Sequence, residues 1–280
     1  MNEFSLIFIS ALVLMTGVEL WLSLRQSRYV TAHRNEVPDA FKDQINLVDH
    51  QKAASYTVAK GQLNRVEGIC GMIILLLWTI GGGLALLSGS WQVFDWSAMT
   101  QGILFILSFF VIGTLIDLPF SWYRTFVLEE KFGFNKNSQG LFFTDLLKQT
   151  VLMLIIGAPL LWGALSLMES AGEYWWLYLW AAWFAFTLLV MWAYPAFIAP
   201  IFNKFTPLED IQLKERVESL LARCGFKSQG IFVMDGSRRS GHGNAYFTGL
   251  GGNKRIVFFD TLLETLNEEQ IEAVLAHELG

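Results

Sequence analysis

The chain has 280 residues, of which 53% are hydrophobic and 16% are charged, and its mean hydropathy is +0.41. This composition is far more apolar than that of a soluble domain and indicates a membrane protein. The formal net charge of −5 and the lack of a lysine- or arginine-rich tract exclude nucleic acid as a partner. The two cysteines, Cys70 and Cys224, have neither metal-ligand nor disulfide-framework spacing, so we interpret both as free thiols.

Five apolar stretches of 18 to 21 residues are each long enough to cross about 30 Å of hydrocarbon. They cover residues 4–24, 69–87, 99–116, 150–168 and 174–194. Together they predict a multi-pass α-helical membrane domain over residues 1–200. The first stretch lacks a basic flank and a cleavage motif, so we expect it to stay as an anchor.

Basic residues are confined to alternate loops between these stretches. The segments before the second and fourth stretches carry lysines and arginines, whereas the short loops before the third and fifth carry none. Because basic loops are retained in the cytoplasm, we expect an outside N-terminus and a cytoplasmic position for every residue after Tyr194. The membrane would be the bacterial inner membrane, or the endoplasmic reticulum or inner nuclear membrane in a eukaryote.

The first basic segment, residues 25–65, is predicted to be a long cytoplasmic helical loop, in which one long helix leads into the second apolar stretch. Pro38 opens it, and apolar residues recur at helical spacing from Phe41 to Leu63. The alternative is an amphipathic helix that lies on the membrane surface or binds a partner.

Polar and small residues in the membrane domain raise two further expectations. Glu19, Glu67 and Asp117 lie in or beside apolar stretches, where ionisable groups usually face a bundle interior or a water-filled cavity. Solvation at the membrane surface explains Glu19 and Glu67 equally well. The triple glycine of residues 81–83 predicts close packing between helices.

The sequence changes character after residue 200, and residues 201–280 predict a mixed α+β segment. One helix carries an apolar face between Leu213 and Leu221. Three short strands follow at residues 231–234, 245–248 and 255–259, and we interpret the glycine-containing stretches between them as hairpin turns.

The last residues, Asn267–Gly280, predict a helix with a chemically useful end. Asn267 and Gln270 have the spacing of a capping box, which marks a helix N-terminus. Ile271, Val274 and Leu275 form an apolar stripe, and His277 lies away from the centre of that stripe.

The pair His277–Glu278 matches the first half of an HExxH zinc motif. In that motif two histidines four residues apart bind Zn²⁺, and the glutamate activates the metal-bound water. We therefore expect His277 to be a metal ligand and Glu278 to be the catalytic base. The second histidine and a third ligand would follow Gly280, so we expect this chain by itself to hold an incomplete site, to bind zinc weakly and to be inactive.

Residues upstream of that helix are candidates for substrate binding. An edge strand before a zinc-binding helix can pair with an extended peptide through main-chain hydrogen bonds. The candidate strand comprises Asn244, Ala245, Tyr246 and Phe247; an ordinary sheet strand is the alternative. His242 lies between two glycines, and three interpretations of it stay open. It stabilises an oxyanion, it tethers another loop, or it is simply solvated.

Several blocks of sequence resemble the CAAX prenyl protease 1 family of integral-membrane zinc metalloendopeptidases. The blocks are Glu129–Lys136, Ile198–Leu208, Val233–Ser240, Asn244–Gly249 with Asn253–Val257, and Ala273–Gly280. The resemblance implies seven helices around an aqueous chamber in the complete protein and one Zn²⁺ on the cytosolic side. It also implies endoproteolysis of the CAAX sequence of prenylated proteins, or of another membrane-associated peptide substrate.

The expected partners are membrane lipid and that peptide substrate, and the sequence defines no oligomeric state. Two alternative functions stay open. One is a heat-shock-type membrane quality-control metalloprotease, for which we expect fewer spans before the motif. The other is a non-catalytic membrane chamber or assembly subunit.

Overall fold

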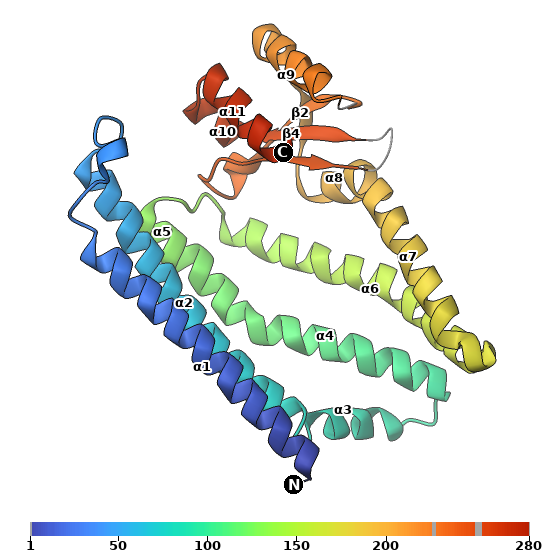
Figure 1. Ribbon diagram of the computed structural model, residues 1–280. Helices are drawn as coiled ribbons and strands as arrows, with labels where there is room; N and C mark the ends of the chain where they lie inside the picture. The colour runs from blue at the N-terminus through green and yellow to red at the C-terminus, as the bar shows by residue number, and fades with distance from the viewer. Residues whose placement is uncertain (1, 226–227, 250–253, 280) are drawn as a thin grey trace. The chain divides into compact units, whose positions relative to one another are not determined.

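The computed structural model describes residues 2–225, 228–249 and 254–279, and the chain divides into two compact units, Met1–Phe132 and Gly133–Gly280. The first unit is helical, and the second joins long helices to a mixed sheet with shorter helices (Figure 1). The expectation of a multi-pass helical membrane protein with a C-terminal α+β segment is confirmed.

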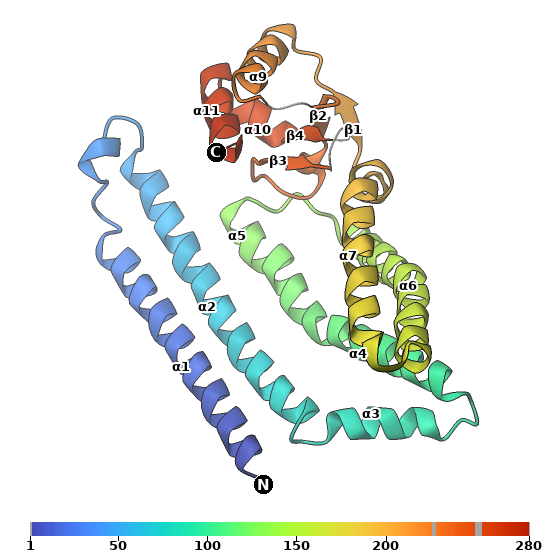
Figure 2. The ribbon, with the colours of Figure 1, turned by 45° about the vertical axis from the view of Figure 1, so that its right-hand side comes forward.

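The first unit contains long helices that begin at polar capping residues. Its elements are α1 (Glu3–Ala32), a 3-10 turn (Asp39–Phe41), α2 (Leu47–Trp78), α3 (Gly83–Gln92), α4 (Ala98–Tyr123), a π-helical segment (Arg124–Glu129) and α5 (Glu130–Phe132). The side chains of Asn2, Asn46 and Ser97 accept hydrogen bonds from main-chain N–H groups in the first turns of α1, α2 and α4. α1 and α2 lie side by side (Figures 1 and 2).

The helix predicted to open at Pro38 is wrong at its start. The chain leaves α1 after Ala32, makes only a 3-10 turn at Asp39–Phe41, and enters α2 at Leu47. The reason is local, because Asn46 adopts an extended conformation and caps the helix by accepting from the N–H of Asp49. From there α2 continues without a break into the second apolar stretch, as predicted.

The triple glycine breaks the second apolar stretch instead of packing helices together. α2 and α3 are bent by 52° at this break. Gly82 has a φ of 78°, a conformation that side-chain-bearing residues rarely adopt. A Cβ at Gly81 would lie 2.7 Å from the carbonyl oxygen of Leu77, so glycine is also required by space. The glycines therefore set a corner in the chain.

Among the described residues, four helical segments are long and apolar enough to cross a membrane: Glu3–Ala32, Ala98–Phe132, Gln139–Ser170 and Gly172–Phe202. The bent pair α2 and α3 is a fifth candidate. Each of the five predicted apolar stretches lies within one of these segments.

Polar groups of α2 pair with the segment that follows α4. Glu67 forms an ion pair with Arg124, and the hydroxyl of Tyr56 donates to Glu129 over 2.6 Å. Arg124 and Glu129 are the two ends of the π-helical segment. Glu67 is thus partnered by a cation from another helix, a pairing that α2 alone does not reveal.

The second unit contains two long helices followed by a small sheet with its covering helices. The elements before the sheet are α6 (Gln139–Ser170), a 3-10 turn (Gly172–Tyr174), α7 (Trp175–Ala193), a π-helical segment (Tyr194–Ile198) and α8 (Ala199–Phe202). The remainder comprises β1 (Phe205–Pro207), α9 (Ile211–Arg223), β2 (Ile231–Met234), a 3-10 turn (Gly236–Arg238), β3 (Ala245–Thr248), β4 (Arg255–Phe259), α10 (Asp260–Thr265) and α11 (Glu268–Leu279).

The described strands form one sheet in the order β1-β2-β4-β3. β2 and β4 are parallel, whereas β1 pairs antiparallel with β2 and β3 pairs antiparallel with β4. The three predicted strands are confirmed with their bounds. The hairpin predicted at Asp235–Gly236 is wrong, because β2 and β3 are not neighbours and the chain makes a 3-10 turn there. The other predicted turn falls partly at residues 250–253, outside the described residues.

The core of this unit lies between the sheet and helices α9, α10 and α11. Val217 of α9, Ile256 and Phe258 of β4, and Leu275 of α11 are almost fully buried and belong to one hydrophobic cluster. The cluster also includes Leu213 and Leu221, the ends of the apolar face predicted for α9. Burial of these side chains fixes α11 against the sheet.

Candidate functional site

Helix α11 starts at the predicted capping box. The N–H of Gln270 donates to the side-chain oxygen of Asn267 over 3.0 Å, and the N–H of Asn267 donates to the side-chain oxygen of Gln270 over 3.0 Å. Each side chain therefore satisfies a main-chain donor at the helix N-terminus. The capping prediction is confirmed.

The two faces of α11 have opposite environments. Ile271 and Leu275 are 2% and 1% exposed, whereas His277 and Glu278 are exposed. The apolar stripe is thus buried, and the candidate ligand and base project from the helix where a substrate can reach them. Within this unit, α11 lies against β3 and α9 (Figure 2).

Ion pairs also hold α11 against α9. Arg216 contacts Glu268 at 2.8 Å, and Arg223 contacts Glu272 at 2.7 Å. These residues were not singled out from the sequence. The basic positions of α9 and the acidic positions of α11 match only once the two helices are placed side by side.

Strand β3 is at the edge of the described sheet, as the sequence analysis expected. The N–H of Phe259 donates to the carbonyl of Asn244 over 2.9 Å, so these two residues form a hydrogen-bonded pair of the antiparallel ladder. Such pairs alternate with non-hydrogen-bonded pairs, and Tyr246 with Val257 is therefore the next hydrogen-bonded pair. The main-chain groups of Ala245 and Phe247 are directed to the outer side of the edge.

The side chain of Asn244 lies along this outer edge. Its amide oxygen accepts the main-chain N–H of Ala245 over 2.9 Å. A peptide strand added to β3 would supply a carbonyl oxygen at the same position. Asn244 therefore satisfies a donor of the edge in the absence of another strand.

The side chain of Tyr246 contacts residues of β2 and β4. The hydroxyl lies 3.8 Å from the sulfur of Met234, and the ring packs edge-to-face on Phe259 at a centroid distance of 6.2 Å. Burial raises the pKa of Tyr246 to about 12, and nearby Tyr194 contributes to the shift. The phenol is therefore protonated at neutral pH.

His242 contacts the chain segment that precedes α6. Its ring stacks on Phe134 with centroids 4.2 Å apart, and the N–H of Gly241 donates to the carbonyl of Phe134 over 2.8 Å. The carbonyl of His242 accepts from the hydroxyl of Thr261 over 2.9 Å. These contacts favour the loop-tethering interpretation of His242, and its role as an oxyanion donor stays a prediction.

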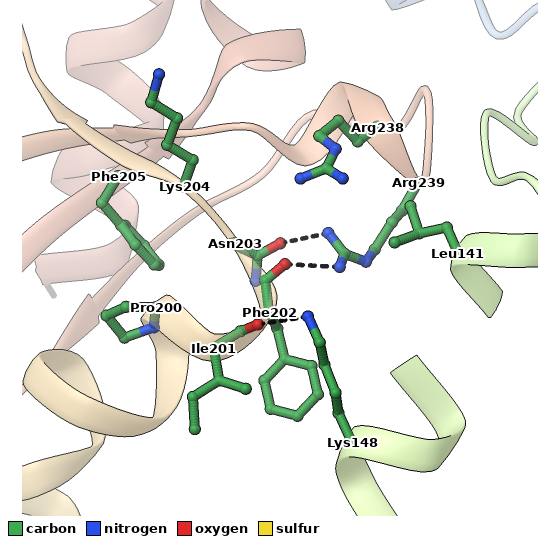
Figure 3. A pocket seen from close by; sticks show the side chains of 10 residues that line it. All are labelled: Leu141, Lys148, Pro200, Ile201, Phe202, Asn203, Lys204, Phe205, Arg238 and Arg239. Atoms are coloured by element: carbon green, nitrogen blue, oxygen red, sulfur yellow. Dashed lines mark hydrogen bonds between the residues drawn. The ribbon is translucent and has the colours of Figure 1, made fainter. Parts of the chain in front are cut away.

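Arg239 joins segments that are distant in the sequence, and Figure 3 shows its hydrogen bonds to Asn203 and Phe202. Its guanidinium donates to both carboxylate oxygens of Asp145 on α6 at 2.7 and 3.1 Å. It also donates to the side-chain oxygen of Asn203 at 2.8 Å and to the carbonyl of Phe202 at 2.6 Å. Through Arg239, these hydrogen bonds hold Phe202 and Asn203, which precede β1, against α6. Sequence reasoning placed Arg239 and Asn203 only within family-like blocks and did not single out Asp145.

His277 is the residue that the sequence predicts as a zinc ligand. His277 is a suitable nitrogen ligand, but no group of three His, Cys, Asp or Glu side chains in the described part of the chain is arranged to hold a metal ion. A protein zinc site of the catalytic type needs three protein ligands. Whether this chain binds zinc stays a prediction.

Family comparisons cover nearly the whole chain. Residues 26–204 match the family described as "CAAX prenyl protease N-terminal, five membrane helices", and residues 207–280 match "Peptidase family M48". The chain belongs to the CAAX prenyl protease 1 family. Together with the apolar helices, this membership makes it an integral membrane protein.

Individual relatives agree with the family match. CAAX prenyl protease 1 of Saccharomyces cerevisiae is 38% identical over 94% of this chain and 60% of the relative, and the Dictyostelium discoideum homolog is 36% identical over 100% and 67%. The crystal structure of S. mikatae Ste24p matches with a TM-score of 0.89 at 36% identity, over 100% of this chain and 66% of that chain. The chain thus spans about three fifths to two thirds of the length of these relatives.

Proposed function

We propose that the protein carrying this chain is a zinc-dependent membrane endopeptidase that cleaves CAAX C-termini of prenylated proteins or a related membrane-associated substrate. The observation that supports this most is the exposed pair His277–Glu278 on a helix that lies against the edge strand β3. A catalytic helix beside an edge strand is suited to hold an extended peptide near a metal. Family membership supports the substrate class, because the relatives are named for CAAX prenyl proteolysis.

In this proposal His277 contributes one imidazole ligand, and residues other than those described complete the site. A zinc ion held there would supply Lewis-acid chemistry that lowers the pKa of water toward about 7. Glu278 takes a proton from the attacking water and then gives it to the leaving amine, so the same carboxylate acts first as base and then as acid.

Strand β3 binds the substrate backbone in the same proposal. An added peptide strand pairs with the outward main-chain groups of Ala245 and Phe247 and takes the place of the Asn244 amide at the N–H of Ala245. Tyr246 lies between these positions and pairs with β4. It supports the strand without donating its own N–H to the substrate.

The catalytic segment is cytoplasmic in this proposal, because basic loops are retained in the cytoplasm and two predicted spans separate the second basic loop from the residues after α7. A cysteine introduced at the exposed position Lys214 tests this orientation. An impermeant thiol reagent should label it only after the membrane is permeabilised, and labelling in sealed outside-out vesicles contradicts the orientation.

Hydrolysis of a farnesylated CAAX peptide tests the catalytic roles in the protein expressed from its complete reading frame. Glu278→Gln should lower the rate by at least about 100-fold while zinc stays bound, because a general base is lost and no ligand is removed. His277→Ala should lose both zinc and activity. Glu264→Gln, the same change at an exposed position of α10, is the control and should keep both. Normal cleavage by Glu278→Gln refutes the proposed mechanism.

Substrate peptides methylated at single main-chain nitrogens test the role of β3. A peptide paired with one strand edge is sensitive at every second residue, because alternate N–H groups face the partner strand. Methylation at alternate positions should therefore raise KM, and methylation at the residues between should have little effect. Equal sensitivity at consecutive positions is incompatible with strand addition and leaves the roles of His277 and Glu278 untouched.

A further inference from the structure

A pocket of about 430 Å³ lies within the second unit where α6, α8 and the loop after β2 meet (Figure 3). Its size falls in the range of about 300–1,000 Å³ that is typical of small-molecule sites. Four of its lining residues are basic: Lys148, Lys204, Arg238 and Arg239. None of its lining residues is acidic. The pocket is therefore built for a negatively charged group.

The charge balance of the pocket is positive. Asp145 neutralises Arg239, and Asp235 pairs with Arg238 at 3.1 Å. In the described part of the chain, no carboxylate lies within 4.0 Å of the amines of Lys148 or Lys204. The remaining excess of positive charge comes from these two lysines.

Donor capacity in the pocket is only partly used. The ammonium of Lys148 donates to the carbonyl of Ile201 over 2.9 Å, and an ammonium has three N–H donors. The guanidinium of Arg238 is about half exposed, and it lines the same pocket as the ammonium of Lys148 and the guanidinium of Arg239 (Figure 3). The stem of Lys204 lines the pocket, and its amine points away from the other cations in this view. Among the described residues Lys148 has no carboxylate partner, and Arg238 has N–H donors beyond the one that Asp235 accepts, so these are the two groups placed to bind an anion.

The position of the pocket along the chain is at a membrane border. Lys148 is the last charged residue before a charge-free stretch that reaches Met168, and Lys204 is the first charged residue after one that begins at Tyr174. Both stretches belong to segments able to span a membrane. Basic residues at this level meet lipid phosphates, and basic pockets between membrane helices bind anionic headgroups.

Exposed apolar side chains lie in the pocket and beside Lys148 in the sequence of α6. Ile201 lines the pocket and is 41% exposed, and the neighbouring α6 residues Leu147 and Val151 are 65% and 44% exposed. A free phosphate would leave these apolar side chains exposed, whereas the acyl chains of a lipid would cover them. The combination of phosphate-binding cations and exposed apolar side chains selects a phospholipid.

We propose that this pocket binds the phosphate of an anionic phospholipid, with Lys148 and Arg238 as ligands and the acyl chains along α6. The site is separate from His277 and Glu278, and none of its lining residues belongs to the proposed catalytic site. The proposal rests on the position of the pocket at the ends of two charge-free stretches able to span a membrane. It does not require the peptidase activity.

Native mass spectrometry of the detergent-solubilised full chain, titrated with phosphatidic acid or phosphatidylcholine of identical acyl chains, tests the proposal. Phosphatidic acid should bind more tightly, and the difference should shrink as salt is raised. Each cation near a lipid phosphate contributes about 1 kcal/mol, so Lys148→Gln and Arg238→Gln should each weaken binding about fivefold and the double variant about 25-fold.

The matched control is the double variant Lys42→Gln/Lys214→Gln. It removes the same charge, and Lys42 pairs with Asp39 three residues away just as Arg238 pairs with Asp235. The control should bind phosphatidic acid like the unaltered chain. Equal weakening by the control, or equal binding of both lipids by the unaltered chain, overturns the proposal.

Competition experiments distinguish a lipid site from a free-phosphate site and need no variant. Inorganic phosphate and glycerol 3-phosphate carry the same anionic group without acyl chains. Displacement of phosphatidic acid only at a large excess of these anions supports the lipid. Displacement at equal concentration shows that the acyl chains add nothing and refutes the proposed ligand.

Discussion

Replacing Arg239 by methionine should destabilise the second unit more than any exposed ion-pair substitution. Arg239 and Asp145 are 23% and 11% exposed, and the guanidinium makes four hydrogen bonds to Asp145, Asn203 and Phe202. Removing one partner of a buried ion pair costs about 3–5 kcal/mol because the other charge is left without compensation. Partial solvent access places the expected loss at the lower end, about 3 kcal/mol.

A double-mutant cycle isolates the part of this loss that belongs to the ion pair. Asp145→Asn removes the charge that Arg239→Met would leave alone, so the combined variant should lose about 2 kcal/mol less than the sum of the two single losses. Arg239→Lys should recover little, because an ammonium cannot bind the carboxylate through two parallel hydrogen bonds.

Thermal unfolding in detergent, corrected to free energies at one temperature, is the assay. Arg216→Met is the control, since its ion pair with Glu268 is 43% and 33% exposed and should contribute about 0.5 kcal/mol. A loss for Arg239→Met no larger than that for Arg216→Met would refute the reasoning. Additive losses in the cycle would show that Arg239 stabilises the fold without coupling to Asp145.

Two further predictions concern other parts of the fold. Gly82→Ala should destabilise by about 1 kcal/mol because φ is 78°, whereas Gly89→Ala inside α3, where an added Cβ meets nothing within 4 Å, should be neutral or stabilising in the same unfolding assay. Burial raises the pKa of Tyr246 from 10.0 to about 12 and so favours the neutral phenol in the folded state. That contribution to stability is complete below pH 10 and is lost as the pH rises toward 12. Tyr246→Phe should therefore lose less stability than the unaltered chain between pH 10 and pH 12. The same dependence of unfolding free energy on pH in both proteins would contradict the raised pKa of Tyr246.

Much of the architecture follows from sequence patterns with short range. Apolar stretches of spanning length locate the membrane helices, because a helix satisfies its main-chain hydrogen bonds within one segment. The capping box at Asn267 and Gln270 locates α11, since both partners lie within one turn. The strands at residues 231–234, 245–248 and 255–259 follow from β-branched and aromatic runs of the right length. Family-like blocks identify the class of protein.

The start of one helix, the bend between two helices and one short strand could not be predicted from the periodicity of apolar residues. The start of α2 depends on Asn46 rather than on Pro38, and the triple glycine bends the chain rather than packing helices. β1 was not predicted, because three residues that include a proline give no strand signal, and only pairing with β2 makes them a strand.

Tertiary structure alone decided which distant residues meet. Asp145 and Arg239 are 94 residues apart in the chain, and Lys148 and Ile201 are 53 residues apart. It also decided that Ala245, and not Tyr246, directs its N–H to the outer edge of β3, because this depends on the register against β4. Local sequence sets helix ends and strand propensity through contacts within a few residues. Partners of a charge and the register of a strand depend on where the rest of the chain packs, so sequence spacing alone does not fix them.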